Sequence, residues 1–365
     1  MKLKKTELVA ALKTASLVRP EYVALYSKNG GLRINAPGRG FGGVVAQANL
    51  SSEDLAVAEA AFQVPFDRFR AIVESMPGDT VTIVLGDKDG AHVASGRTRL
   101  RVSAVYDPAI DEIDAEAVSQ ADKFCAFDSE VLSAAITMVS HAMAENDVRF
   151  FLNGMHINVR EGGDTEVVAT NGHRLVINRI QAKSVSGAFR ATLAPAAVHL
   201  LKSMSADGDV KLSIIDKTLV AQRGDWLCRM ALYSEYIKDY DRVIPRDHGA
   251  QFDVSRLEFA AAFHRVMLAD EDRKHKAVVV KSGDPGVVAI SLGSDPTSCD
   301  EIGVQQCAPF EYGVNGRYVE EFLSACRDEM VQVSIKDMDR MIIAPVGTKD
   351  VSKASYATVI TGMRA

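Results

Sequence analysis

The chain has 365 residues, of which 47% are hydrophobic and 25% charged, and its formal net charge is −6. This length accommodates several domains of ordinary size, and the composition is that of a globular protein. No apolar run approaches the roughly 18 residues of a membrane span, and the interrupted amphipathic start does not have the pattern of a secretion signal. The negative charge excludes a protein that coats nucleic acid by bulk positive charge, although an acidic protein can keep a basic inner surface.

The cysteines exclude a disulfide framework and a zinc ribbon, because they are odd in number, far apart in sequence and without any CxxC pair. They are Cys125, Cys228, Cys299, Cys307 and Cys326. The eight histidines show no ligand spacing either. We therefore expect a cytoplasmic protein with no cofactor and no metal site.

An internal repeat is the most informative feature of the sequence. Residues 64–85, 193–215 and 314–337 share one pattern: an apolar residue, a short one-faced helix, a small acidic or glycine-rich turn and an alternating strand. A second helical pattern precedes each copy, at residues 6–18, 128–143 and 253–268, and in the last of these Ser255 and Glu258 have capping-box spacing.

The recurrence of two helix types in one order predicts an α+β protein of three repeated domains. Each domain is expected to pack two helices on antiparallel sheets, with boundaries that give domains 1–121, 122–249 and 250–365. The alternative is chance similarity among generic helix–turn–strand units.

The sequence EVVATNGHRLVINRI, residues 166–180, predicts two strands joined by an Asn-Gly turn. An enzyme could use His173 as a base beside Arg174. However, no Ser/His/Asp set, HExxH motif or phosphate-binding glycine loop accompanies it. The other interpretation is a hairpin with two exposed polar residues, and the pattern alone leaves both open.

Five segments together resemble the bacterial sliding clamp, the beta subunit of DNA polymerase III, in order and spacing along the chain. NDVRFFLNGMHI is followed by VVATNGHRLVINR, where the family has ATDGHRLA. YIKDYDRVIP is similar to the family's PDYRRVIP, VNGRYVEEFL to FNxxYLLDAL, and the terminal YATVITGMRA to YVVMPMRL. On these segments the chain is identified as a member of this family. It is a divergent member, because domain 1 resembles the family sequences least.

The resemblance implies a homodimer whose two protomers join head to tail into a ring of six domains around duplex DNA. It implies a processivity factor that catalyses no reaction. Its expected partners are duplex DNA of any sequence, the catalytic subunit of DNA polymerase III, a clamp loader and other proteins that carry a clamp-binding peptide. No membrane partner is expected.

A sliding contact must use phosphates, and so it needs scattered basic residues on inner helices. The resemblance places Arg19, Asn146 and Arg149 near DNA, and Lys202 is a further candidate. Where the family often carries a basic pair, this chain has Pro195 and Ala196. The middle domain is therefore expected to hold DNA weakly.

The resemblance also implies a cleft between domains 2 and 3 that accepts a short partner peptide, often a Gln followed by a hydrophobic end. Thr361-Gly362 replaces the family's Met-Pro, Ala365 its terminal Leu, and Lys238 a cleft proline, so the cleft is expected to be shallower and more flexible. The matching positions are Leu152, Thr170, Gly172, His173, Arg174, Leu175, Arg242, Val243, Val359, Ile360, Met363 and Arg364.

The dimer contact is expected to join domain 1 to domain 3 of the next protomer, with Leu100 and Leu268 at matching positions and a charged loop at 270–276. Two alternatives remain beside the clamp. One is an enzyme that uses His173. The other is a clamp-derived binding protein, or an accessory paralogue from a mobile element, that no longer encircles DNA; the divergent domain 1 and the weak middle-domain charge motivate it.

Overall fold

The structure is a computed structural model, and every structural statement below concerns the residues that it describes. These are residues 1–28, 31–38, 45–52, 61–86, 90–106, 112–204, 208–237, 239–245, 249–270, 277–283, 286–305, 307–336 and 339–363.

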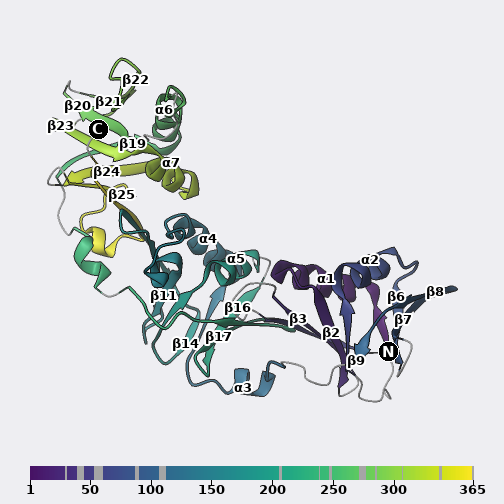
Figure 1. Cartoon of the computed structure of the whole chain (residues 1–365). Helices are drawn as coiled ribbons and strands as arrows, with labels where there is room; N and C mark the ends of the chain where they lie inside the picture. The colour runs from purple at the N-terminus through teal and green to yellow at the C-terminus, as the bar shows by residue number, and fades with distance from the viewer. Residues whose placement is uncertain are drawn as a thin grey trace. The chain divides into compact units, whose positions relative to one another are not determined.

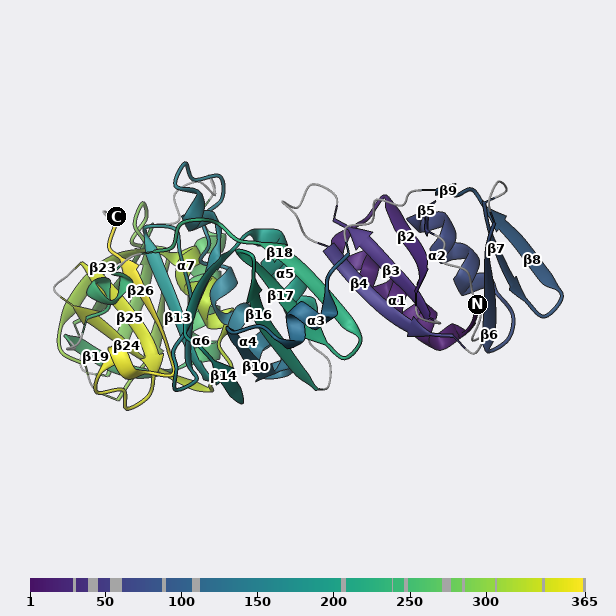
Figure 2. The ribbon, with the colours of Figure 1, turned by 90° about the horizontal axis from the view of Figure 1, so that it is seen from below.

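The chain forms two compact units (Figures 1 and 2). Unit 1 comprises Met1–Glu130, Lys183–Phe189 and Leu193–Leu232, and unit 2 comprises Val131–Ala182, Arg190–Thr192 and Tyr233–Ala365. The division between the two units falls within the second of the three repeats. The three domain boundaries proposed above therefore remain a prediction.

Unit 1 is built on a ten-stranded sheet in the order β14-β10-β16-β17-β18-β4-β3-β2-β5-β9 and a four-stranded sheet in the order β1-β6-β7-β8. Helix α1 packs against α2, and the 3-10 helix η1 contacts α5. The elements are β1 (Lys2–Lys4), α1 (Lys5–Ala15), η1 (Ser16–Val18), β2 (Tyr22–Lys28), β3 (Gly31–Pro37), β4 (Val45–Ser51), β5 (Ala61–Pro65), α2 (Phe66–Ser75), β6 (Thr80–Gly86), β7 (Gly90–Ser95), β8 (Thr98–Val102), β9 (Val105–Tyr106), α3 (Ala115–Ser119), β10 (Phe124–Asp128), β14 (Ser184–Ser186), α5 (Pro195–Ser203), β16 (Asp209–Ile215), β17 (Thr218–Arg223) and β18 (Trp226–Ala231).

Unit 2 contains an eight-stranded sheet in the order β15-β11-β12-β13-β26-β25-β24-β19 and a four-stranded sheet in the order β22-β21-β20-β23. Helix α6 packs against α7. The elements are α4 (Ser129–Ser140), η2 (Phe150–Asn153), β11 (Met155–Val159), β12 (Asp164–Thr170), β13 (Arg174–Gln181), β15 (Phe189–Leu193), η3 (Tyr240–Val243), β19 (Ala250–Ser255), α6 (Arg256–Leu268), β20 (Ala277–Ser282), β21 (Val287–Leu292), β22 (Cys299–Gly303), β23 (Phe310–Asn315), α7 (Gly316–Ala325), β24 (Met330–Lys336), β25 (Arg340–Pro345), η4 (Val351–Lys353) and β26 (Tyr356–Thr361).

The predicted repeat is confirmed as a recurring strand–helix–strand unit: β5-α2-β6, β15-α5-β16 and β23-α7-β24. The second helix type also recurs, each time directly after a strand, in β1-α1, β10-α4 and β19-α6. The short helix α3 was not predicted, because its five residues are too few to show a helical period.

Helix ends explain where the predicted boundaries shift. Ser255 does cap α6, since its hydroxyl accepts the Glu258 N–H at 3.4 Å. The helix nevertheless begins at Arg256, later than predicted, because Asp253 still pairs with Gln332 in the sheet. Pro195 begins α5, a position where its missing N–H costs nothing. Asn315 caps α7 by accepting the Arg317 N–H at 3.1 Å.

Aromatic side chains fill the interior under α6 and α7 in unit 2. Phe259 and Phe263 meet edge to face at 5.0 Å, and Phe252 stacks on Phe310 at 5.8 Å. In unit 1 the matching layer is formed by buried residues such as Leu8, Leu12 and Phe69. Among the described residues, no helix is long and apolar enough to cross a membrane.

Candidate functional site

The NGHR sequence lies at the tip of the hairpin formed by β12 and β13, where Thr170 pairs with Leu175. The side chain of Asn171 accepts the N–H groups of His173 and Arg174 at 3.0 and 3.1 Å. Gly172 has a φ of +87°, which a residue with a side chain adopts only under strain. The predicted hairpin is therefore confirmed, and an Asx turn fixes its tip.

The expectation that both polar residues at this turn are exposed holds for His173 and is wrong for Arg174, which is only 6% exposed. The Arg174 guanidinium forms an ion pair with Glu321 at 2.7 Å, donates to the His141 carbonyl and lies 4.3 Å from the centre of the Tyr318 ring. Arg174 therefore fastens β13 to α7 and to the end of α4.

The predicted cleft residues divide between two faces of the eight-stranded sheet, because successive residues of a strand point to opposite faces. Leu175 pairs with Val359, and Arg174 pairs with Ile360. Leu175 and Val359 belong to an apolar cluster on one face. Arg174 and Ile360 face the other side, on which Arg174 meets α7.

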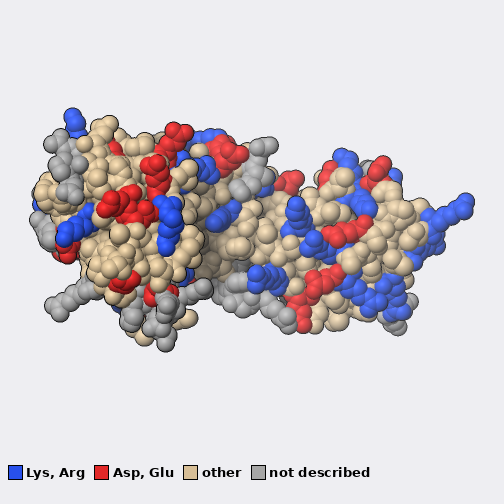
Figure 3. Space-filling model, turned by 90° about the horizontal axis from the view of Figure 1, so that it is seen from above, with Lys and Arg blue, Asp and Glu red and all other residues tan. Residues whose placement is uncertain are grey.

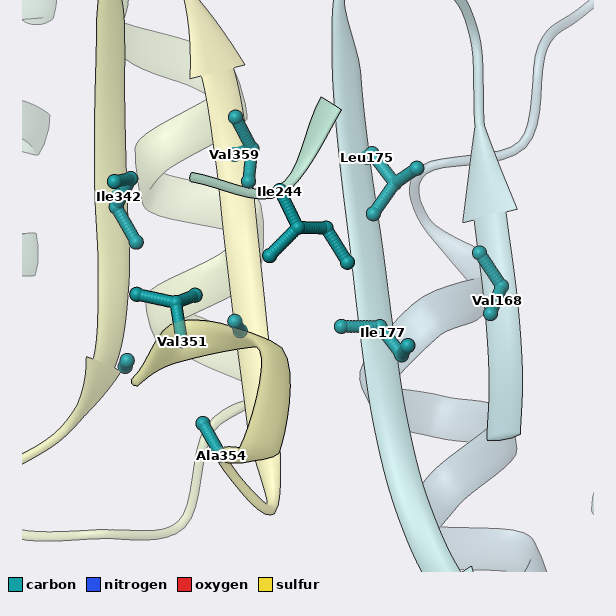
Figure 4. Close-up of a cluster of buried hydrophobic side chains, with 10 residues drawn as sticks. Val168, Leu175, Ile177, Ile244, Ile342, Val351, Ala354 and Val359 are labelled. Atoms are coloured by element: carbon teal, nitrogen blue, oxygen red, sulfur yellow. The ribbon is translucent and has the colours of Figure 1, made fainter. Parts of the chain in front are cut away.

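The apolar cluster is a patch of buried side chains from β12, β13, β25 and β26, covered by residues outside the sheet (Figure 4). Figure 4 shows Ile244, which directly follows η3, between Val359 on one side and Leu175 and Ile177 on the other, while Val351 and Ala354 close the patch from the η4 segment. The members are Val168, Leu175, Ile177, Ile244, Ile342, Ala344, Val351, Ala354, Ala357 and Val359, with Tyr240 packed against them.

Five of the predicted cleft residues are exposed at the surface: Gly172, His173, Arg242, Val243 and Met363. Arg242 and Val243 lie on η3, and Val243 is 45% exposed. His173 lies at the hairpin tip, and Met363 follows β26. Leu152, on η2, is buried, as are Thr170 and Ile360. Arg364 and Lys238 lie outside the described residues.

Backbone hydrogen bonds hold the chain after β26 as far as Met363. The N–H groups of Thr361, Gly362 and Met363 donate to the carbonyls of His173, Asp339 and Gly313 at 2.9, 2.8 and 2.9 Å. A Cβ atom at Gly362 would lie 3.2 Å from the Tyr312 ring, so glycine here allows the tail to lie directly on that ring.

A polar pocket of about 510 Å³ opens beside the hairpin tip. It contains His173 and Arg174, which were predicted for the peptide cleft, together with Asn146, which was predicted for DNA. The sequence interpretation did not assign Asn315, Tyr318 or Glu321 to any site, although all three lie in or beside the recognised VNGRYVEEFL segment. The lining residues that define the pocket's chemistry are His141, Asn146, Asn171, Arg174, Arg317 and Tyr318.

Two histidines in unit 2 are held in the neutral form. Burial, reinforced by the Arg174 charge, lowers the pKa of His141 to about 4. Burial likewise lowers the pKa of His156 to about 4, although its Nε2 lies 3.0 Å from the Phe151 carbonyl and its Nδ1 2.9 Å from Thr192. Neither imidazole is therefore a base for chemistry near neutral pH.

We expect these two histidines to make the protein less stable as the pH falls from about 6.5 towards 4. The unfolded state binds protons in this interval and the folded state does not, so stability rises with pH across it. Between pH 7.5 and 5.0 each histidine should cost about 2 kcal/mol of unfolding free energy. Urea unfolding at the two pH values measures the loss. The variants His141→Gln and His156→Gln should each lose less, and an equal loss in both variants and the unmodified protein would contradict the assignment.

The residues predicted to contact DNA occur in both units. In unit 1, Arg19 follows η1 with a φ of +49°, and η1 contacts α5, which carries Lys202. In unit 2, Asn146 has a φ of +59°, and Arg149 forms an ion pair with Asp147 at 2.9 Å. That pairing lowers the pKa of Asp147 to about 2. Arg149 thus has an internal counter-ion that a phosphate would have to share or replace.

The residues predicted for the dimer contact lie at exposed edges. Leu100 is 40% exposed on β8, the edge strand of its sheet, and Leu268 is 67% exposed at the last residue of α6. The loop at 271–276 lies outside the described residues. The described residues contain no group of His, Cys, Asp and Glu that could hold a metal ion, and all five cysteines are unpaired.

Comparison with known proteins covers both sequence and fold. Residues 126–233 match the family model for the DNA polymerase III beta subunit, central domain. The beta sliding clamp of Vibrio cholerae is 27% identical over 279 residues, 75% of each chain, and that of Pseudomonas aeruginosa is 26% identical over 307 residues, 82% of this chain and 81% of the relative. The crystal structure of the Pseudomonas aeruginosa sliding clamp bound to griselimycin has a TM-score of 0.84 at 22% identity, over 100% of this chain and 99% of that one.

The agreement of the full-length fold, the repeated domain and the central-domain match leads to one assignment. The chain is a divergent relative of the bacterial beta sliding clamps, and its full-length fold and its central domain are similar to those of the DNA polymerase III beta subunit.

Proposed function

We propose that two copies of this DNA sliding clamp close head to tail into a ring around duplex DNA and tether a DNA polymerase through a peptide that binds near the apolar cluster. The tether raises the local concentration of the polymerase at the primer end without any covalent chemistry. The observation that carries the proposal is the agreement with clamp structures over the whole chain.

The edge strands support the head-to-tail contact. β8 and β22 each stand at the end of a four-stranded sheet and so offer unpaired backbone groups. Arg99 and Arg101 are exposed on β8, and Glu301 is exposed on β22, where Asp300 is paired with Arg265. A basic edge on one protomer and an acidic edge on its partner are complementary in charge, which favours one register of contact.

The surface charge supports a mobile contact with DNA. In Figure 3, Lys and Arg side chains are scattered among Asp and Glu and form no single dense basic patch. Contacts of this kind go to phosphates, are independent of base sequence and weaken with salt. The absence of Lys and Arg from α4 limits the contribution of that helix.

The residues around the apolar cluster support the peptide site. Val243 is exposed on η3 next to Ile244, which packs into the buried cluster, while His173 is exposed at the hairpin tip and Met363 after β26. A mostly apolar surface with a few polar groups is the usual make-up of a small-ligand or peptide site.

Retention on closed circular DNA tests the ring. Loaded protein should stay on nicked circular plasmid through gel filtration in about 0.2 M salt, where phosphate contacts alone weaken strongly, and should leave when the plasmid is cut at one site. Equal loss from circular and linear DNA would contradict encirclement and would favour a clamp-derived binding protein that no longer surrounds DNA.

A further inference from the structure

Glu166 is a buried carboxylate at the centre of a hydrogen-bond network on β12, only 5% exposed. Its Oε2 accepts the Tyr240 hydroxyl at 2.7 Å, Arg160 Nη2 at 3.0 Å and Asn158 Nδ2 at 3.2 Å. Its Oε1 accepts Arg179 Nε at 3.1 Å. Burying a charge this deeply is costly unless several partners compensate it, and here four side chains do.

The network connects both segments that cover the apolar cluster. Through Tyr240 it reaches η3 and the following Ile244. Through Arg179 it reaches the η4 segment, because Arg179 Nη1 donates to the Ala354 carbonyl at 2.7 Å and the Arg179 N–H donates to the Ser355 carbonyl at 2.7 Å. Glu166 lies on the same face of β12 as Val168, two residues further along, which belongs to the cluster.

The segment 239–244 is therefore anchored at two points. The Tyr240 hydroxyl is held by Glu166, and the Ile244 side chain is buried in the cluster. Arg242 and Val243 lie between these anchors and are exposed. Within the segment, the N–H of Arg242 donates to the Asp239 carbonyl at 3.0 Å. The two exposed side chains are thus presented by a short turn whose ends are both fixed.

We propose that Glu166 is a positioning residue for the peptide site: acting through Tyr240, it holds segment 239–244 in the conformation that presents Arg242 and Val243 to an incoming apolar-ended peptide. This inference rests on the proposed function. A segment that already has its bound conformation loses little conformational entropy when the peptide binds, and binding is therefore stronger.

The charges around Glu166 favour its ionised form. Desolvation raises its pKa, but the Tyr240 hydroxyl and the charges of Arg160 and Arg179 outweigh that effect and leave the pKa below its usual value. Burial, reinforced by the hydrogen bond to Glu166, raises the pKa of Tyr240, so the tyrosine remains a hydrogen-bond donor at neutral pH. The pairing therefore joins an anion to a neutral donor, which is among the stronger kinds of hydrogen bond.

The test compares Tyr240→Phe, Glu166→Gln and the double variant with the unmodified full-length protein. The probe is a fluorescein-labelled pentapeptide, Gln-Ser-Ala-Leu-Phe, whose dissociation constant is measured by fluorescence anisotropy. We expect Tyr240→Phe to weaken binding about three- to tenfold. The variant loses one charge-assisted hydrogen bond, and only the part of that energy that orders segment 239–244 for the peptide affects binding. Glu161→Gln, a loss of the same charge at an exposed position before β12, should leave affinity unchanged.

The double variant separates positioning from a general structural role. If Glu166 acts through Tyr240, Glu166→Gln should weaken binding less in the Tyr240→Phe background than in the unmodified protein. Hydrogen exchange supplies a second readout: Tyr240→Phe should speed exchange at the Arg242 and Ile244 amides while leaving the amides of β12 unchanged. Tyr240→Phe keeps every charge of the network, so it carries the test if Glu166→Gln fails to fold.

The outcomes distinguish this inference from the proposed function. No binding of the probe by the unmodified protein would overturn the peptide site, and the positioning role with it. Binding that Tyr240→Phe leaves unchanged, fully additive losses in the double variant, or unchanged exchange at segment 239–244 would overturn the positioning role alone.

Discussion

Replacing Arg174 by alanine is expected to lower the free energy of unfolding by about 3 kcal/mol, because it removes the buried partner of the partly buried Glu321 carboxylate. The substitution also removes the guanidinium from the Tyr318 ring and leaves the His141 carbonyl without its donor. Urea unfolding at pH 7.5 measures the effect. Arg174→Lys should recover little of the loss, because a lysine cannot bridge a carboxylate, a carbonyl and an aromatic face at once.

Arg317 provides a matched control, since it contacts the same carboxylate. Its Nε lies 2.5 Å from Glu321 Oε1, one helical turn away on α7, but its side chain is largely in solvent. Exposed pairs of this kind contribute between zero and about 1 kcal/mol. A loss in Arg317→Ala as large as that in Arg174→Ala would show that burial does not explain the difference, and would contradict the structural role assigned to Arg174.

The fold could be predicted from the sequence to the extent that local patterns determine it. The helix–turn–strand repeat and the Asn-Gly hairpin both depend on short-range periodicity and turn chemistry, and both are confirmed. The start of α6 was placed too early because Asp253 pairs with Gln332, a residue far away in sequence, and no local pattern reveals such a pairing. Tertiary pairing overrode local helix propensity there.

The site could be predicted less completely, because residue types at matching positions do not reveal which face of the sheet each side chain takes. Arg174 and Leu175 are neighbours in one motif, yet pleating sends the first towards α7 and the second into the apolar cluster. Glu166 was not singled out at all. Its importance depends on Tyr240, which lies more than 70 residues further along the chain, and one sequence does not reveal that contact.

The ring that we propose contains the same interface between protomers twice. A head-to-tail dimer that closes contains two identical seams, so any change at one seam is repeated at the other. Leu100 is exposed in the protomer on β8, between Arg99 and Arg101, and so it is accessible to an acidic edge strand of the partner. An aspartate there would lose the apolar burial and place a negative charge against that edge.

Leu100→Asp is therefore expected to convert the dimer into monomers. Losing one buried leucine costs about 2 kcal/mol per seam, hence about 4 kcal/mol per ring, which corresponds to a roughly thousandfold weaker dimer. Analytical ultracentrifugation at micromolar concentration measures this, with circular dichroism to show that the protomer still folds. Leu257→Asp on α6, where the leucine is 65% exposed, is the matched control and should remain dimeric.

If Leu100→Asp stays dimeric at nanomolar concentration, β8 does not lie in the seam. If the unmodified protein is itself a monomer, no seam closes a ring, and the tethering mechanism fails because one protomer cannot encircle DNA.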